Sequence, residues 1–218
     1  MRCVPSFVTI ILLAGFCLYG RAQSTESKIN ETKGLPPRAA PSDYQAHAQA
    51  GTVTVVGEFT GHAVPVPEGP LMTEDYVVVE AGLFGPAGTR IKMSIDDFSL
   101  RINGKKTPLS SQPYVVVNRS LKDPEWTPPE AAEPKSKSSF GTGGQSDSNL
   151  PPPPVHIPIE LRRAMAQHVQ KAALAEGERT LPQAGLIFFQ YRGKRETIHS
   201  LELSYNGPAG QATLTLQP

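Results

Sequence analysis

The residue types that most often carry out chemistry are sparse in this chain of 218 residues. The histidines are His47, His62, His156, His168 and His199. No H-E-x-x-H or similar cluster occurs, and no two of the histidines have the spacing of metal ligands. The sequence therefore predicts neither a metal site nor a cofactor, and we expect His168, beside an apolar helical stripe, at the boundary of a core.

Adjacent carboxylates occur twice, as Glu74-Asp75 and Asp96-Asp97. Neighbouring side chains on a strand point to opposite faces of the sheet, so neither pair predicts a catalytic dyad. We expect Asp96 and Asp97, which precede Phe98, to cap backbone amides in a turn. Calcium binding at Asp96-Asp97 is an alternative that lacks further oxygen ligands at a recognisable spacing.

Two motifs typical of enzymes are also missing from the sequence. Residues 141–146 (GTGGQS) lack the lysine of a phosphate-binding loop, and no G-x-S-x-G nucleophile motif occurs. The sequence therefore predicts a protein that is not an enzyme. The alternative is a hydrolase whose catalytic residues assemble only in the folded chain.

Two short basic turns are formed by Lys105-Lys106 and by residues 192–195 (RGKR). They indicate either solvated hairpin tips or a contact with anionic polymers of the cell envelope. The whole chain carries a formal charge of only +1, so it has no global field to attract nucleic acid. We therefore expect no nucleic-acid partner.

The only tryptophan, Trp126, lies between Pro124 and Pro128. Exposed tryptophan is enriched at binding hot spots, so this side chain could anchor a partner. It could equally fold back onto a sheet. Together with Tyr114 it suggests an alternative function, in which the domain holds a polysaccharide or a small ligand on exposed aromatic rings.

The first 22 residues have the composition of a secretory signal peptide. Arg2 precedes an apolar stretch over residues 7–18, and Ala22 supplies the small residue before an expected cleavage site at Gln23. The apolar stretch is too short to span about 30 Å of hydrocarbon at about 1.5 Å per residue. We therefore expect no membrane span after cleavage, and a periplasmic or secreted location.

Both cysteines, Cys3 and Cys17, lie in this segment. Lipid attachment through Cys17 is an alternative to simple cleavage, although Phe16 is larger than the residue that normally precedes a lipidated cysteine. Cleavage before Gln23 would leave a chain without disulfides, with 19 basic and 20 acidic residues. Export without disulfides fits a protein of the bacterial envelope.

The elements that must position any site are mainly strands. Residues 23–50 are polar and rich in small residues and proline, which predicts a flexible leader. The first part of a β-sandwich is expected over residues 51–118, where Asn103-Gly104 marks a tight hairpin turn. Strands are expected over residues 53–59, 76–84, 91–95, 98–102 and 114–117.

Residues 119–156 contain eight prolines and a tract rich in serine, lysine and glycine. Such a stretch cannot bury enough apolar area to offset its ordering entropy, so it predicts a disordered insert. An amphipathic helix is expected over residues 157–177, capped by Gly177. Its apolar stripe should pack on the sheet and comprises Leu161, Met165, Val169 and Ala172.

The closing part of the sandwich is expected over residues 183–218. Strands are expected over residues 185–191, 198–205 and 212–216, with a turn starting at Asn206-Gly207. The chain should therefore be an all-β, immunoglobulin-like antiparallel sandwich of about seven to eight strands. The proline-rich insert and the helix interrupt it.

The segment from residue 74 to 117 resembles the telokin-like, immunoglobulin-like domains of exported bacterial proteins. The resemblance rests on residues 76–80 (YVVVE), on residues 95–100 (IDDFSL) and on the glycine hairpin that follows. Residues 184–189 and 201–203 are similar to the closing strands of that family, so about 80 residues are covered. The resemblance implies an accessory or interaction role and brings no catalytic residue with it.

These observations predict an exported, non-catalytic domain of the bacterial envelope that acts through protein contacts or has a structural role. The insert and the helix would be its docking element, with Trp126, Leu161, Met165 and Val169 as candidate interaction residues. The partner would be an envelope protein or a polysaccharide.

Overall fold

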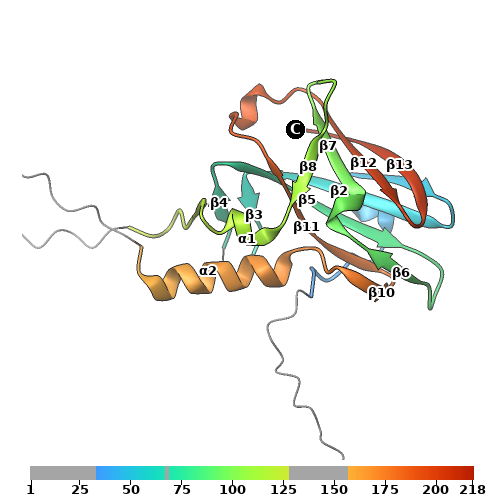
Figure 1. Ribbon diagram of the computed structural model, residues 1–218, viewed down its shortest axis with the longest axis horizontal. Coiled ribbons are helices and arrows are strands. Elements are labelled where there is room, and N and C mark those ends of the chain that lie inside the picture. The colour runs from blue at the N-terminus through green and yellow to red at the C-terminus, as the bar shows by residue number, and fades with distance from the viewer. Residues whose placement is uncertain (1–32, 67–68, 128–156) are drawn as a thin grey trace, which may run out of the picture.

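The computed structural model describes residues 33–66, 69–127 and 157–218. They form a mostly β fold around one eight-stranded antiparallel sheet (Figure 1), which confirms the predicted strand-rich, antiparallel architecture. In order across the sheet, the strands are β1 (Ala46–Ala50), β2 (Val53–Gly61), β5 (Tyr76–Phe84), β11 (Gln183–Gln190), β8 (Leu109–Gln112), β7 (Phe98–Ile102), β12 (Leu201–Gly207) and β13 (Gly210–Leu216).

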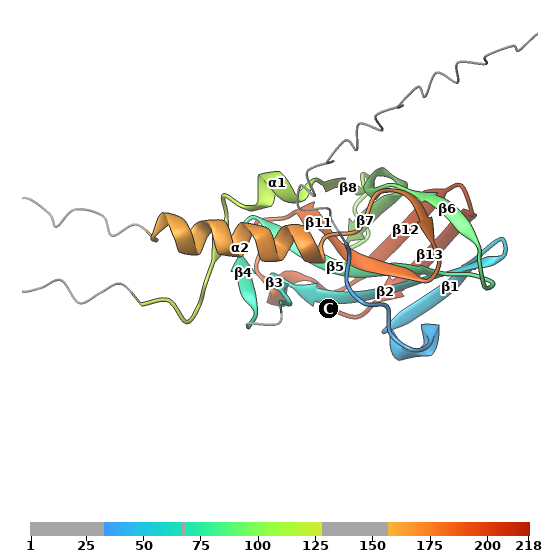
Figure 2. The same ribbon diagram turned by 90° about the horizontal axis from the view of Figure 1, so that it is seen from below.

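The sheet curls until it is nearly barrel-like, so that its edge strands β1 and β13 lie side by side (Figure 2). The Gln45 side chain donates from Nε2 to the Gln217 carbonyl oxygen at 3.0 Å next to this seam. Alternate residues of the strands point into the enclosed main core, where Leu100, Leu203 and Leu214 are almost fully buried. This is the period-two pattern that the sequence predicts.

Strands β5 and β11 are buried on both faces. Their inner face contributes Val79 and Ile187 to the main core, while their outer face contributes Val78 and Phe188 to a second core. The second core is covered by helix α2 (Ile159–Ala172) and by the small sheet of β3 (Ala63–Val64), β4 (Leu71–Thr73) and β9 (Leu121–Lys122) (Figure 1). Burial on both faces explains why these two strands are continuous apolar runs in the sequence.

Helix α2 confirms the predicted apolar stripe but ends at Ala172, five residues before the expected Gly177 cap. After Ala172 the chain becomes extended, because it pairs with β11. There the Leu174 amide donates to the Leu186 carbonyl oxygen at 2.9 Å. Gly185 permits this approach, since a Cβ there would lie 2.4 Å from the Leu174 Cα. A close tertiary contact therefore overrides the local helix signal.

Residues 114–117 form a one-turn helix, α1 (Tyr114–Val117), and not the predicted strand. Pro113 precedes it with φ −66°, and its carbonyl oxygen accepts from the Val116 amide at 3.1 Å. Strand β8 already pairs with β11 through Ser111 and Gln112, and the chain must then leave the main sheet to reach β9. The β-branched composition of this run is overridden by that route.

The predicted flexible leader is wrong for residues 33–50. The Leu35 amide donates to the Ala184 carbonyl oxygen at 2.9 Å, a short 3₁₀ turn spans Pro41–Asp43, and β1 begins at Ala46. The Arg38 side chain anchors this segment to the outer face of β2 and β5 through Glu58 (2.6 Å) and Glu80 (3.2 Å). Proline-rich composition therefore coexists here with a fixed chain path.

Two turns differ in detail from the prediction. Asn103 and Gly104 do have positive φ angles (52° and 64°), but β8 starts only at Leu109. Strand β12 continues through Gly207, and Pro208 and Ala209 make the turn into β13. A further ribbon pairs β6 (Arg90–Met93) with β10 (Gly177–Thr180), which the sequence did not predict as a pair.

The insert predicted over residues 119–156 begins inside ordered structure, because Leu121 and Lys122 form β9 against Thr73 and Met72 of β4. Residues 128–156 lie outside the described residues. So do the predicted signal peptide, its Ala22–Gln23 cleavage site and Cys17. In the part of the chain that the structure describes, no helix has the length and apolar character needed to cross a membrane.

Candidate functional site

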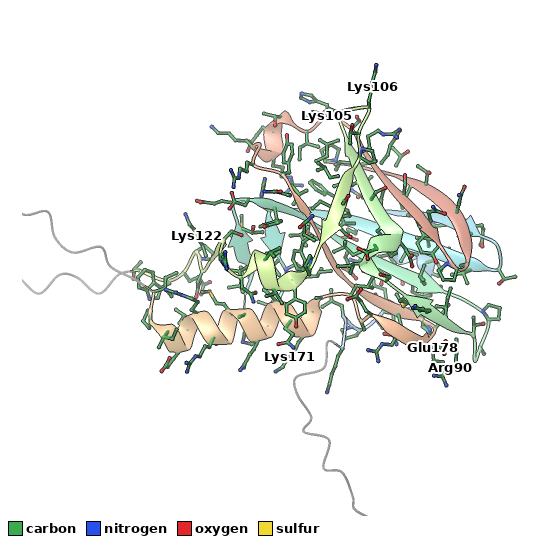
Figure 3. The ribbon with its side chains drawn as sticks, viewed as in Figure 1. Arg90, Lys105, Lys106, Lys122, Lys171 and Glu178 are labelled. Carbon is green, nitrogen blue, oxygen red and sulfur yellow. The ribbon has the colours of Figure 1, made fainter. Side chains whose placement is uncertain are left out.

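The two basic turns that the sequence singles out meet at one end of the sheet. A shallow groove of about 540 Å³ lies between them. Lys105 and Leu109 line one side of it, and residues 190–193 line the other. Figure 3 shows Lys105 and Lys106 extending from this end, on the far side of the molecule from helix α2. We call the surface formed by residues 103–109 and 190–200 the basic end.

Asn103 links the two halves of the basic end. Its side-chain Nδ2 donates to the Thr197 carbonyl oxygen at 2.7 Å. Its Oδ1 accepts from the His199 amide at 2.7 Å and from the Ser200 amide at 3.2 Å. Its own amide donates to the Ser200 carbonyl oxygen at 2.9 Å. One side chain therefore fixes the basic turn at Lys105 against the basic loop at residues 192–195.

The backbone at Asn103 makes this contact possible. The Lys105 amide donates to the Ile102 carbonyl oxygen at 3.2 Å, with Asn103 and Gly104 both at positive φ, which is the geometry of a type I′ turn. Asparagine tolerates the left-handed region better than most residues because its short polar side chain can hydrogen-bond nearby. Here that side chain bonds to the neighbouring loop.

The basic loop is also braced from within. The Tyr191 hydroxyl lies 2.9 Å from Thr197 Oγ1, which donates to the Lys194 carbonyl oxygen at 2.7 Å. A Cβ at Gly193 would lie 2.4 Å from the Tyr191 ring, so only glycine fits where the loop crosses this side chain. A short 3₁₀ turn, Arg195–Thr197, completes the loop. Its basic side chains consequently project from a defined backbone.

His62, at the end of β2, ties the same loop to the body of the domain. Its Nε2 lies 2.9 Å from the Gly193 carbonyl oxygen and its Nδ1 lies 3.0 Å from the Thr73 carbonyl oxygen. Both partners are backbone carbonyl oxygens, so the ring nitrogens link the basic loop to β4. The His62 and Tyr191 rings are stacked with centroids 6.4 Å apart.

The basic end carries five cations and one carboxylate, Glu196. Its cations are Lys105, Lys106, Arg192, Lys194 and Arg195, and all five are exposed. Arg192 Nε lies 2.9 Å from Asp75 Oδ1, and the Arg195 guanidinium lies 5.9 Å from the centre of the Phe59 ring. These contacts orient the two arginines without covering them, since 73% of the Arg192 side chain remains exposed. A nearly neutral chain thus concentrates positive charge at one end.

Comparisons with protein-family models, with curated protein sequences and with solved structures found no match for this chain.

The predicted interaction residues on helix α2 belong to its buried stripe. Met165 and Val169 are 2% and 0% exposed and pack in the second core. Met165 also lines the pocket described next. Leu161, one turn earlier than Met165, is half-buried and lines a pocket of about 220 Å³ between α2 and the loop before β4. We call this the helix-side pocket; Leu71 lies in its wall, and Asp123 and Glu125 add two carboxylates.

The two aromatic residues proposed as a ligand platform lie at different places. Tyr114, on α1, lines a separate pocket of about 200 Å³ together with Phe188 of β11. Trp126 is half-buried in the segment after β9 and does not line either of these pockets. The described structure therefore does not bring the two rings together as one platform.

The adjacent carboxylates Asp96 and Asp97 lie in a turn before β7. Asp96 and Asp97 belong to a 3₁₀ turn, Ile95–Asp97, in which the Asp96 amide donates to Ser94 Oγ at 3.2 Å. Burial raises the pKa of Asp97, and the charge of Asp96 adds to this, while a hydrogen bond from the Ser94 backbone opposes it. Among the described residues, no three His, Cys, Asp or Glu side chains come close enough to hold a metal ion. His156 and residues 141–146 lie outside the described residues.

Sequence reasoning identified both basic turns but missed the residues that join them. Asn103 was recognised for its turn geometry alone, and His62 as an isolated ring. Their roles depend on carbonyl groups 94 and 131 residues away along the chain, which no local pattern encodes.

Proposed function

We propose that this chain is an exported, non-catalytic interaction domain of the bacterial envelope whose recognition surface is the basic end. The observation that carries the proposal is the Asn103 side chain, which holds two basic segments together by three hydrogen bonds. Loops held on a rigid scaffold are the usual place for binding residues. Fixing the loops before a ligand arrives also reduces the entropy that binding must overcome.

The proposed fold is immunoglobulin-like. Its support is the division of the sheet into two four-stranded halves, β1-β2-β5-β11 and β8-β7-β12-β13, which enclose the main core together. The strand pairing between the halves is made by β8, whose Ser111 and Gln112 pair with β11. The proposed resemblance to telokin-like domains rests on β5, η2 (Ile95–Asp97) and β7, which carry the sequence runs at residues 76–80 and 95–100.

The proposed export rests on the amino-terminal sequence alone. Arg2, the apolar residues 7–18 and Ala22 have the pattern of a cleaved signal peptide. The ligand would then be met in the periplasm or outside the cell, as an envelope protein or a polysaccharide. No nucleic-acid partner is proposed, because the net charge of the chain is close to zero.

The test is retention on isolated bacterial envelopes. The full-length chain, exported through its own leader, is mixed with envelope fractions and sedimented at increasing salt. We expect the variant Lys105→Gln/Lys106→Gln/Lys194→Gln to lose retention about tenfold, because exposed ion pairs contribute modestly each and are screened by salt. The matched control is Arg163→Gln/Lys171→Gln on the exposed face of α2, which should be retained like the natural chain. Equal retention of all three proteins would overturn the proposal.

A second candidate function is protein docking on the helix side, where the sequence predicts a docking element formed by the helix and the insert. The observation in its favour is the helix-side pocket, where Leu71 and Leu161 lie near the carboxylates of Asp123 and Glu125. That combination fits an apolar side chain flanked by lysine or arginine on a partner segment. A displayed peptide library should yield such segments against the natural chain and against Arg163→Glu, but not against Leu161→Glu. A library that yields no such motif would remove this candidate.

A further inference from the structure

We infer that the ligand of the basic end is an acidic polysaccharide, a chain of sugars that bear carboxylate groups. This inference rests on the proposed function and specifies the class of its ligand.

The groove combines uncharged and cationic lining residues. Leu109, Gln190 and Tyr191 are uncharged, while Lys105 and Arg192 contribute one cation from each of the two segments. A sugar ring presents C–H and hydroxyl groups to the uncharged residues, and its carboxylate can reach a cation. A guanidinium binds a carboxylate through two parallel hydrogen bonds, a geometry that Arg192 can offer from its exposed end groups.

The groove is large and open. Its volume is about 540 Å³, and it is shallow enough for a chain to lie across it. Further cations continue beyond the groove on the same two segments, as Lys106, Lys194 and Arg195. A repeating polyanion can place successive carboxylates along these cations, whereas a single small anion can satisfy one or two of them.

The distribution of exposed apolar side chains favours a polysaccharide over a lipid surface as the ligand. Proteins that dock on anionic membranes combine basic residues with apolar side chains that enter the interface. In the described residues, the large apolar side chains that are exposed are Met72, Val115, Val116 and Ile159. None of the four belongs to the basic end, so this surface has charge without an inserting group.

The same distribution argues against an acidic protein as the ligand. Protein interfaces place aromatic or aliphatic anchors at their centre and charges at their rim. Tyr191 is held by its hydrogen bond with Thr197 and lies against Gly193, and both Tyr191 and Leu109 are half-buried. The basic end therefore offers no projecting apolar anchor for a protein partner.

The inference is tested by calorimetry and ultracentrifugation on the exported full-length protein, with an alginate hexasaccharide as the probe. Comparison probes are a neutral glucose hexasaccharide, polyglutamate, vesicles of phosphatidylglycerol and phosphatidylcholine, and single-stranded oligothymidine. We expect binding to alginate that weakens with salt, and no detectable binding to the neutral sugar.

The variant Lys105→Gln/Arg192→Gln should bind alginate at least about tenfold more weakly, since it removes one cation from each of the two segments that line the groove. Arg163→Gln/Lys171→Gln should bind like the natural chain, and thermal melting confirms that each variant is folded.

The outcomes separate this inference from the proposed function. Stronger binding to polyglutamate, to vesicles or to oligothymidine than to alginate overturns the polysaccharide assignment and leaves the basic end as the recognition surface. Alginate binding that is unchanged in Lys105→Gln/Arg192→Gln also overturns it. If, in addition, charge variants of the basic end leave envelope retention unchanged, the proposed function fails as well.

Discussion

Asn103 and Thr197, 94 positions apart in the chain, are joined by a 2.7 Å hydrogen bond from the Asn103 Nδ2 to the Thr197 carbonyl oxygen. Because Asn103 also accepts from two amides of the same loop, its side chain joins a hairpin turn to a loop from the second half of the chain. The relative position of five cations at the basic end depends on this link.

Asn103→Gly should weaken this link without disturbing the turn. Glycine keeps the positive φ of 52°, so the substitution removes only the side-chain hydrogen bonds. We expect the free energy of unfolding to fall by about 1–2 kcal/mol, given the usual net value of a hydrogen bond and the exposure of this site. Binding of anionic probes at the basic end should also weaken, as measured by calorimetry.

Gly104→Ala is the matched control for Asn103→Gly. A Cβ at Gly104 meets no atom within 4 Å, so its cost is limited to the strained φ of 64°. It should lower stability by about 1 kcal/mol and leave ligand binding intact. If both variants lose stability but neither changes binding, the Asn103 link does not position the ligand site.

Gly185→Ala should be among the most damaging single-methyl additions. The new Cβ would lie 2.4 Å from the Leu174 Cα and 2.7 Å from the Leu174 nitrogen, and backbone atoms cannot move aside as a side-chain tip can. We expect the segment after α2 to separate from β11, with a loss of about 3 kcal/mol or more in the free energy of unfolding, at the upper end for overpacking. Chemical denaturation measures this loss, and Gly88→Ala, in open space but at a positive φ of 79°, is the control. Equal stability of the two variants would contradict the close approach.

The contrast between β5 and α2 shows what the sequence could reveal about this fold. Strand β5 spans the residues predicted for it, 76–84, because its apolar run and the Gly85-Pro86 stop are local signals. The apolar stripe of the helix at Met165 and Val169 could also be predicted from the sequence, but the residue at which the helix ends could not. That end depends on Gly185, whose missing side chain lets a distant segment approach.

The candidate site divides in the same way. Lys105 and residues 192–195 are visible as basic turns, whereas their proximity depends on hydrogen bonds made by Asn103 and His62 across the fold. The leader was misjudged for a related reason. Its composition is typical of a mobile chain, but Arg38 forms ion pairs with two carboxylates on the sheet, which the composition does not indicate.

Arg38→Met should therefore release the segment that precedes β1. Arg38 Nη1 and Nη2 lie 2.6 Å from Glu58 and 3.2 Å from Glu80, and the guanidinium lies 4.5 Å from the centre of the Tyr44 ring. The hydrogen bond to Glu58 raises the pKa of Arg38, as does the charge of Glu80, against the opposing effect of burial. A raised pKa stabilises the fold at every pH below the pKa of the same group in the unfolded chain, so this contribution is constant across the neutral range.

The expected loss for Arg38→Met is about 1–3 kcal/mol, less than for a fully buried pair because a third of the Arg38 side chain is exposed. Much of it would come from Glu80, whose side chain is 10% exposed and would lose its cation. Arg38→Met/Glu80→Met should recover part of the stability, and limited proteolysis should cut near residue 38 only in the single variant. A single variant as stable and as resistant as the natural chain would show that the clamp is not energetically significant.

Asp97→Asn should stabilise the protein at neutral pH. Burial is the main reason that the pKa of Asp97 is raised above 3.8, and its Oδ2 lies against the backbone of Gly207 near the Tyr205 hydroxyl. A carboxyl group whose pKa is raised by folding stabilises the folded state at a pH below its pKa in the unfolded chain, where it is protonated. This contribution is lost as the pH rises through its pKa in the folded chain. The natural chain therefore carries a penalty at pH 7 that asparagine avoids.

We expect Asp97→Asn to gain less than about 1 kcal/mol in the free energy of unfolding, because the group is only partly buried. Urea denaturation between pH 7 and pH 3 should show the gap between the two proteins closing as the pH falls toward 3.8. Glu178→Gln, at an exposed carboxylate 3.8 Å from Arg90, is the control, and a gap that widens in acid would show that ionised Asp97 is favoured in the fold.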